Sequence, residues 1–370
     1  MGETEKPIRV AQIMGKLWAG GVEAVVFNYY RAIDKSKVQF DFYYDADSTV
    51  EPPQDLVDMG AGFYKVPPYQ QLPKYLKTLL GYFRKNKYQI IHSHINTLSV
   101  FPLFAAWVSR IPVRVAHNHS VPNGREFKRN ALKYFLRQFA TIFPTHYFAC
   151  SEKAGKWLFG TRNYNEGKIT VIRNAIDFDR FASSEPKRTE LRSKLHITDK
   201  FVVGHVGRFT YAKNHMFLLN VFSEISKKNE NAVLILVGDG ELHDEVIGKI
   251  KELDLEGKVI LTGKVQNPED YYHAFDIMVM PSVFEGLPLT VIEAQIAQIP
   301  IIVSEAISEE AVISNGCKYR SLKNTADEWA EAALKCSQIE VVLNEKSQMY
   351  NIRNQASNLM NWYLQRSKEL

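Results

Sequence analysis

The 370-residue sequence contains no apolar run of the roughly 18 residues that a membrane-spanning helix needs. Its first nine residues are polar and charged, so we expect no secretory signal peptide. Only three cysteines occur, none in C-x-x-C spacing, which argues against a disulfide framework. Together these absences predict a cytoplasmic protein whose thiols are buried and reduced.

Acidic residues are almost absent from one segment. Residues 65–137 hold 13 basic residues and a single acid, Glu126. Residues 1–180 carry 25 basic and 15 acidic residues, a net charge of +10, whereas residues 181–370 carry 21 and 26, a net charge of −5. A basic surface in the first half would attract anionic lipid, a pyrophosphate or nucleic acid, or would only be a well-solvated face. Charge alone leaves these alternatives open.

The chain is longer than a single hydrophobic core usually supports, so we expect two domains. A strand at Ile8–Met14 runs into a glycine-rich turn and a helix from about Val22 to Ile33, which is a Rossmann-type opening. The turn lacks G-x-G-x-x-G, so NAD binding is not expected. Strand, loop and helix recur from Phe201–Arg208 onward. The sequence therefore predicts two similar α/β halves.

Residues 276–300 contain the most informative pattern. A buried strand, Asp276–Pro281, leads into a glycine-containing loop and a helix that begins at Leu289. Free amides at such a helix start suit an anion such as a diphosphate. Glu285 and Glu293 bracket the loop and could accept hydrogen bonds from sugar hydroxyls. The alternative is that both only stabilise the helix start, and an isolated E-x7-E would favour it.

Residues 282–294, SVFEGLPLTVIEA, resemble the signature of glycosyltransferase family 4, retaining enzymes of the GT-B fold that use nucleotide-sugar donors. VRVAHNHS, HVGRFTYAKNH and MPSVFEGLPLTVIEAQ look like its EpsF-like bacterial exopolysaccharide and capsule branch. The resemblance covers nearly the whole chain. It implies two Rossmann-like domains facing a central cleft, residues 1–180 for the acceptor and 181–345 for the nucleotide-sugar. A C-terminal helix, residues 346–370, is expected to pack back on the first domain.

The resemblance places the donor on the second domain. Arg208 and Lys213 match the family's GR…KN pattern and would hold the diphosphate with the amides of the helix start. Glu285 would position sugar hydroxyls and Glu293 the ribose, while backbone groups after the strand Val259–Thr262 would hold the base. The predicted donor-binding residues are Gly21, Arg208, Lys213, Gly238, Lys264, Val265, Glu285, Gly286, Leu287, Leu289 and Glu293.

Two H-x-H pairs end neighbouring predicted strands of the first half. His92 and His94 close one strand and His117 and His119 the other, and residues i and i+2 share a face, so the pairs could converge. For His92 and His94 the alternative is polar lining of a cleft rim, favoured for His92. The resemblance assigns one histidine to the donor sugar; the predicted catalytic residues are His117 and Glu285. The predicted acceptor-binding residues are Gly20, Gly21 and His119.

A predicted helix at Arg125–Phe143 mixes basic and aromatic residues. Such a helix usually packs its apolar side on a core. The alternative is a helix lying on a membrane surface, which would suit an enzyme that glycosylates lipid-linked sugars. A second predicted helix, Leu72–Lys87, is also basic and aromatic.

These features predict a retaining glycosyltransferase that moves a hexose or N-acetylhexosamine to a glycan or lipid-linked sugar acceptor in cell-surface glycan synthesis. UDP is the expected nucleotide by resemblance. No cofactor and no metal are expected, because cationic side chains and helix starts would neutralise the diphosphate. The expected partners exclude nucleic acid and include an anionic membrane, on whose inner face the enzyme would be peripheral.

Three alternatives remain open at this point. A metal-dependent hydrolase could use the H-x-H pairs, although no nearby acid completes a usual site. A nucleotide-sugar epimerase or a phosphorylase would share the fold. A non-catalytic partner in an assembly complex would not need the charged residues of the second half.

Overall fold

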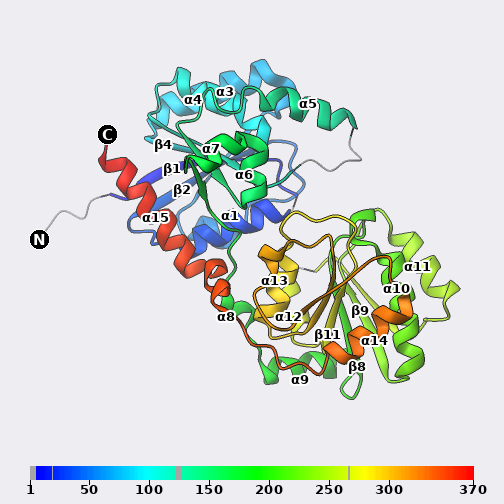
Figure 1. Ribbon diagram of the computed structural model, residues 1–370. Helices are drawn as coiled ribbons and strands as arrows, with labels where there is room; N and C mark the ends of the chain where they lie inside the picture. The colour runs from blue at the N-terminus through cyan, green and yellow to red at the C-terminus, as the bar shows by residue number, and fades with distance from the viewer. Residues whose placement is uncertain (1–5, 19, 122–126, 266) are drawn as a thin grey trace, which may run out of the picture. The chain divides into compact units, whose positions relative to one another are not determined.

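The computed structural model describes residues 6–18, 20–121, 127–265 and 267–370, without the side chains of residues 127–130. It divides the chain into two compact units, residues 1–176 with 349–370 and residues 177–348. Each unit is built on a parallel sheet with helices, and the C-terminal helix belongs to the first unit (Figure 1). The predicted fold class is confirmed. Among the described residues, no helix is long and apolar enough to cross a bilayer.

The first unit contains a seven-stranded sheet in the order β3-β2-β1-β4-β5-β6-β7. Its strands are β1 (Ile8–Gly15), β2 (Val38–Asp45), β3 (Gly62–Val66), β4 (Ile90–Ser93), β5 (Val113–Asn118), β6 (His146–Ala149) and β7 (Ile169–Val171). The central strands are buried along most of their length, because helices cover both faces of a parallel sheet.

The two faces of this sheet are covered by different helices. Ala11 and Ile13 of β1 pack in a cluster with side chains of α3, α4 and α6, whereas α15 packs on α1 and β2 on the other face. The helices of this unit are α1 (Gly21–Ala32), α2 (Gln54–Asp58), α3 (Leu72–Asn86), α4 (Val100–Val108), α5 (Phe127–Arg137), α6 (Glu152–Phe159), α7 (Thr161–Asn165) and α15 (Ile352–Lys368). On α15 the buried residues Ile352, Ala356, Leu359 and Tyr363 follow helical spacing.

The second unit contains a six-stranded sheet in the order β10-β9-β8-β11-β12-β13. Its strands are β8 (Phe201–Val206), β9 (Ala232–Val237), β10 (Val259–Gly263), β11 (Ile277–Met280), β12 (Ile301–Ser304) and β13 (Cys317–Arg320). Its helices are α8 (Phe178–Phe181), α9 (Glu185–Lys194), α10 (His215–Lys228), α11 (His243–Glu252), α12 (Pro268–Tyr272), α13 (Leu289–Ile296) and α14 (Ala326–Cys336).

Some predicted boundaries are wrong. The basic helix expected to reach Phe143 ends at Arg137, where turns with i to i−3 hydrogen bonds replace it. Its expected first residues, Arg125 and Glu126, lie outside the described residues. The sequence also predicts a short helix at Tyr271–Phe275. The structure begins this helix at Pro268, because proline suits a first helical turn.

Candidate functional site

The candidate donor site lies where the strand order of the second sheet reverses. The chain leaves β8 toward β9 on one side and leaves β11 toward β12 on the other, so the loops after β8 and β11 diverge at one edge. Ligands of open α/β sheets bind at such switch points, beyond the carboxyl ends of the strands. The loops after β9 and β10 end at the same edge because all these strands are parallel.

Lys213 and Glu285 come from the two diverging loops and contact each other. The Lys213 Nζ lies 2.6 Å from the Glu285 Oε1, and the side chains are only 17% and 13% exposed. The Ser282 hydroxyl donates to the same carboxylate oxygen at 2.9 Å. The loops are also joined through the Val283 N–H, which donates to the Ala212 carbonyl at 2.9 Å. A cation and a carboxylate are therefore held together at the switch point.

The other predicted residues of these loops are less enclosed. Arg208 is exposed and lies 3.5 Å from the Glu241 carboxylate. Gly238 has φ +135°, and a Cβ there would lie 2.2 Å from the Gly207 carbonyl oxygen, so only glycine fits. Lys264, which is exposed, and Val265 follow β10. The structure thus brings these residues to one edge of one sheet.

The start of α13 completes this edge. Pro288 precedes the helix and no side chain among the described residues caps it, so the amide of Leu289 is open to a ligand. Gly286 is exposed and Leu287 is half-buried in the loop before it. Orphan amides at a helix start, together with the helix dipole, favour a negatively charged group.

Glu293 lies in the second turn of α13 and is held by a tyrosine. The Tyr272 hydroxyl donates to its Oε2 at 2.7 Å. Burial raises the pKa of Glu293 to about 7, although the Tyr272 hydrogen bond opposes the shift. Sequence reasoning missed Tyr272, because only tertiary packing of α12 against the rest of the unit brings it near the carboxylate.

In the first unit, the turn between β1 and α1 is closed by Glu23. Its carboxylate accepts hydrogen bonds from the backbone N–H groups of Trp18 at 3.0 Å and Gly20 at 3.1 Å. A Cβ on Gly20 would lie 2.7 Å from the Trp18 indole nitrogen, whereas one on Gly21 would meet nothing within 4 Å. A side chain at position 20 would displace the exposed Trp18 indole, and Glu23 stabilises the turn.

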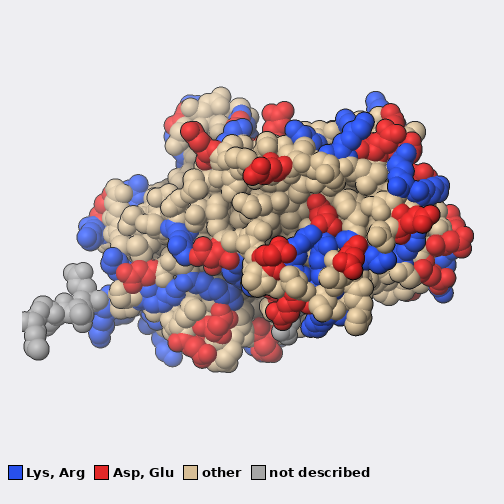
Figure 2. Space-filling view, turned by 90° about the horizontal axis from the view of Figure 1, so that it is seen from below, with Lys and Arg blue, Asp and Glu red and all other residues tan. Residues whose placement is uncertain are grey.

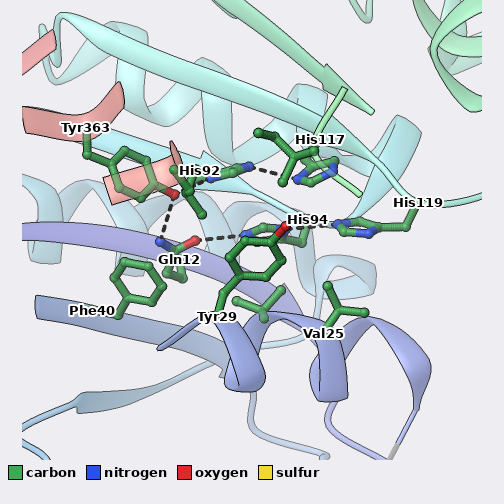
Figure 3. Close-up of a pocket in the computed structure, with 12 residues that line it drawn as sticks. Gln12, Val25, Tyr29, Phe40, His92, His94, His117, His119 and Tyr363 are labelled. Atoms are coloured by element: carbon green, nitrogen blue, oxygen red, sulfur yellow. Dashed lines mark hydrogen bonds between the residues drawn. The ribbon is translucent and has the colours of Figure 1, made fainter. Parts of the chain in front are cut away.

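The two H-x-H pairs converge, as the sequence suggested. His92 Nε2 lies 3.0 Å from His117 Nδ1, and His94 Nδ1 lies 2.9 Å from His119 Nε2 (Figure 3). The expectation that His92 lines a cleft rim is wrong, because its side chain is only 1% exposed. Burial lowers the pKa of His92, His94 and His117 well below the usual value and that of His119 to about 4, so all four are neutral.

Two residues that the sequence analysis did not single out connect the pairs. Gln12 on β1 accepts a hydrogen bond from His94 Nε2 at 2.8 Å and donates to the Tyr363 hydroxyl at 3.3 Å. That hydroxyl lies 2.5 Å from His92 Nδ1. A glutamine inside the apolar strand was a sequence signal for Gln12, whereas Tyr363 lies 271 residues from His92 and its contact depends on α15.

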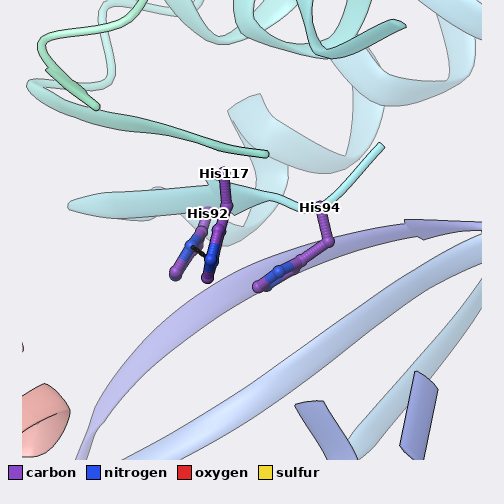
Figure 4. A group of neighbouring side chains, drawn as sticks. All are labelled: His92, His94 and His117. Atoms are coloured by element: carbon purple, nitrogen blue, oxygen red, sulfur yellow. Dashed lines mark hydrogen bonds between the residues drawn. The ribbon is translucent and has the colours of Figure 1, made fainter. Parts of the chain in front are cut away.

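Three of these histidines are close enough to share a metal ion. Ligand nitrogens of His92, His94 and His117 lie within 4.8 Å of one another (Figure 4). Both nitrogens of His92 and of His94 are, however, already hydrogen-bonded to neighbouring side chains. The ring nitrogens of His92 and His94 thus have hydrogen-bond partners within the protein and do not need a metal ion.

Two family models match the chain on either side of the division between the units. The model described as Glycosyltransferase Family 4 matches residues 19–180, and Glycosyl transferases group 1 matches residues 187–356. The sequence is also 31% identical to EpsF of Bacillus subtilis (strain 168) over 330 residues, which is 87% of this chain and 86% of that protein. The chain belongs to the family 4 glycosyltransferases. This glycosyltransferase is thus an enzyme of the predicted family and class.

Other similar proteins agree with this assignment. The glycosyltransferase is 25% identical over 328 residues to an Escherichia coli UDP-Gal:alpha-D-GlcNAc-diphosphoundecaprenol alpha-1,3-galactosyltransferase, covering 85% of this chain and 84% of that one. Anabaena Alr3699/HepE, solved with UDP, superposes with a TM-score of 0.73 at 19% identity over 98% and 99% of the two chains. Sucrose-phosphate synthase from Thermosynechococcus elongatus gives 0.73 at 18% identity over 98% and 100%. At these identities the solved structures establish the shared fold.

Proposed function

We propose that this glycosyltransferase is a retaining enzyme that transfers a hexose or N-acetylhexosamine from a UDP-sugar to a lipid-linked sugar in exopolysaccharide or capsule synthesis. The observation that carries the proposal is the Lys213–Glu285 contact at the switch point of the second sheet, beside the uncapped start of α13. A lysine has three donors, so Lys213 can hold a diphosphate oxygen while it keeps Glu285 in place for the sugar hydroxyls.

The chemistry at this edge would be electrostatic. Negative charge grows on the diphosphate as it leaves, and Lys213, Arg208 and the Leu289 amide are preorganised to stabilise it. Glu293 would accept hydrogen bonds from the ribose hydroxyls. Retention is proposed from the family, and the cavity beside His117 includes no Asp or Glu among its described lining residues that could act as a covalent nucleophile.

UDP and the acceptor class are proposed from relatives. The Escherichia coli relative is named for a UDP-sugar and a diphosphoundecaprenol-linked acceptor, and HepE was solved with UDP. We propose that no metal is needed. The Asp-x-Asp sequences at 45–47 and 177–179 have other partners: Asp47 pairs with Lys16 at 2.9 Å, and Asp177 caps α8.

A donor screen tests this function. Thermal shift and sugar-nucleotide hydrolysis would be measured with UDP-, GDP- and ADP-sugars, each with and without EDTA. We expect a UDP-sugar to stabilise the protein most, with unchanged turnover in EDTA. A strict requirement for Mg²⁺ or Mn²⁺, or stabilisation only by another nucleotide, would contradict the proposed donor site.

We also propose that the first unit docks peripherally on the inner face of an anionic membrane. Apolar side chains of α4, α5 and the turns after α5 are exposed: Trp107, Val108, Leu132, Tyr134, Phe135, Phe139 and Ile142. On the same unit lies α3, which Figure 1 draws next to α4. It exposes only basic charge: Lys74, Lys77, Arg84 and Lys85. Both features suit an anionic bilayer surface. On the face drawn in Figure 2, by contrast, basic and acidic side chains are intermingled.

A further inference from the structure

The buried histidines form a single chain of hydrogen bonds with two ends. Its order is His119, His94, Gln12, Tyr363, His92 and His117, and each neighbour lies within 2.5 to 3.3 Å of the next. Each neutral imidazole has one N–H donor and one bare acceptor nitrogen. Every contact needs one donor and one acceptor, so satisfying each buried proton links the direction of one hydrogen bond to the direction of the next.

The side-chain amide of Gln12 determines the direction of the hydrogen bonds in this chain. Its carbonyl oxygen only accepts, so His94 carries its proton on Nε2 and accepts at Nδ1 from His119. Its amide NH₂ only donates, and it donates to the Tyr363 oxygen at 3.3 Å. The opposite amide orientation would require an O–H···O bond of that length, which exceeds the usual range of about 2.5–3.0 Å. The distances therefore favour the orientation found.

The rest follows from Tyr363. Its oxygen accepts from Gln12, and the acceptor that remains for its own buried proton among the described partners is His92 Nδ1, because a second acceptance from His92 would leave that proton unpaired. His92 then carries its proton on Nε2 and donates it to His117 Nδ1. His117 is left with its proton on Nε2, a buried atom that has no hydrogen-bond partner among the described residues. An unpaired buried donor is costly, which points to an oxygen supplied from outside the protein.

The geometry points to Gln12 and Tyr363 as positioning residues that hold His117 as a hydrogen-bond donor, through Nε2–H, to an oxygen of the transferred sugar. This inference rests on the proposed function, and on the family resemblance that assigns His117 to the donor sugar. It excludes a role for His117 as a general base, because the bare nitrogen of its ring is already occupied by His92. The small cavity lined by these hydrogen-bonded side chains, about 10 Å³, has room for about one oxygen-sized group.

Histidine tautomers can be read directly by NMR of protein with ¹⁵N-labelled imidazoles. In the wild type we expect His117 and His92 to be protonated on Nε2. In Gln12→Glu, once the new carboxyl is ionised, Tyr363 must donate to it, so His92 donates from Nδ1 and His117 loses its Nε2 proton. Because a preorganised donor is lost, kcat should fall about 10²-fold with KM little changed.

Tyr363→Phe is the second variant, and it has a matched control. Without the hydroxyl neither tautomer of His92 is enforced, so we expect a mixture of His117 tautomers. Because only molecules with His117 protonated on Nε2 can donate to the sugar, kcat should fall about twofold or more, in proportion to their fraction. Tyr29 is equally buried and lines the same cavity, but its hydroxyl donates to the Arg173 carbonyl at 2.7 Å. Tyr29→Phe should leave the tautomers unchanged.

Several outcomes would overturn the inference. They are a wild-type His117 protonated on Nδ1, one equivalent of metal bound to the purified protein, a Tyr363→Phe variant that matches Tyr29→Phe, or normal kcat in Gln12→Glu with reversed tautomers. Far-UV circular dichroism would verify that each variant is folded. Failure of the proposed function is distinguishable from failure of this inference. In that case the wild-type protein would transfer no sugar, although NMR would still show its histidine tautomers.

Discussion

At the scale of single residues, the contact between Lys213 and Glu285 determines how the donor site works. Each side chain comes from a different loop, and each keeps the other in place when no donor is bound. The pair is mostly buried, so removing one partner leaves a poorly solvated charge. Loss of activity must therefore be separated from loss of stability.

We expect Lys213→Ala and Glu285→Ala each to lower transfer by at least about 10²-fold, because each removes a group aimed at the diphosphate or the sugar. Initial rates with the preferred donor, and thermal melting of each variant, are the measurements. Lys249→Ala is the control, since Lys249 pairs with Glu252 on α11 away from these loops. Normal turnover in either site variant would show that the donor site is misassigned.

Glu293 predicts a pH dependence of donor binding. Without bound donor, the carboxyl of Glu293 has a pKa of about 7. Only its ionised form can accept two hydrogen bonds from the ribose. Affinity for UDP-glucose should therefore rise as the pH increases through 7. Below pH 7 it should weaken by up to about tenfold for each pH unit. Calorimetry between pH 6 and 8 measures this, because a sugar-diphosphate diester does not titrate there. A Glu293→Gln variant should show a flat profile, and an equal slope in both proteins would contradict the assignment.

Individual positions could be found in the sequence more easily than their partners. The loop around Glu285 was recognisable because its chemistry is local to a short motif. The contacts of Glu285 with Lys213, of Glu293 with Tyr272 and of His92 with Tyr363 join elements far apart in the chain. No spacing rule encodes such contacts, since they depend on how the sheet and helices pack.

At the scale of elements, α3 and the region of α4 and α5 determine whether the first unit can bind a membrane. Lys128 and Arg129, part of the predicted basic face of α5, have no described side chains, whereas the exposed lysines of α3 are described. The apolar patch is continuous at least locally, because the rings of Phe135 and Phe139 are 5.3 Å apart.

We expect the protein to co-sediment with anionic vesicles and to be released by salt, because each basic residue near such a surface contributes about 1 kcal/mol. Lys74→Glu/Lys77→Glu/Lys85→Glu should weaken binding by on the order of 10²-fold or more. Phe135→Ser/Ile142→Ser should weaken it by loss of apolar contact. Lys249→Glu in the second unit is the matched control. Equal binding to neutral and anionic vesicles, or none at low salt, would leave only the alternative that these charges bind the acceptor pyrophosphate.

Elements were predicted well where a pattern was strong and poorly where it was weak. The sequence predicts a strand at Ile301–Ser304 and a helix at Glu152–Phe159, and β12 and α6 have these bounds. β13 was missed because three of its four residues are exposed, as suits a strand at the edge of the sheet, so no buried pattern marks it. α4 was missed because its sequence is apolar throughout, so no amphipathic period marks it.

At the scale of the whole molecule, buried neutral histidines predict acid sensitivity. Burial lowers the pKa of His205 to about 4 and that of His215 to about 2 in the second unit, as it lowers those of the four histidines in the first. Unfolded histidines titrate near 6.5, so below that pH the unfolded chain binds more protons and the native state loses stability. Glu293 and Asp45, whose pKa values burial raises to about 7 and about 6, act in the opposite direction, but they are two groups against these six histidines.

The free energy of unfolding should therefore fall by several kcal/mol between pH 7 and 5.5, at up to about 1.4 kcal/mol per pH unit for each histidine. Urea unfolding at a series of pH values measures this. A His205→Gln variant should have a shallower pH slope, whereas His243→Gln, which replaces a more exposed histidine, should not. A stability that is constant from pH 7 to 5.5 would mean that these rings are not buried and neutral.

The contribution of α15 to the first unit has a consequence for how the protein is made. Residues 1–176 leave the ribosome long before Tyr363, with 186 residues between them. At the usual 5–20 residues per second, this delay is roughly ten to forty seconds. During this delay the nascent first unit lacks Tyr363, which completes the hydrogen-bond chain of its histidines. Its sheet also lacks the covering helix α15. The unit that is synthesised first is thus the last to be completed, and a chaperone that protects this exposed face would have to act while the second unit is being synthesised.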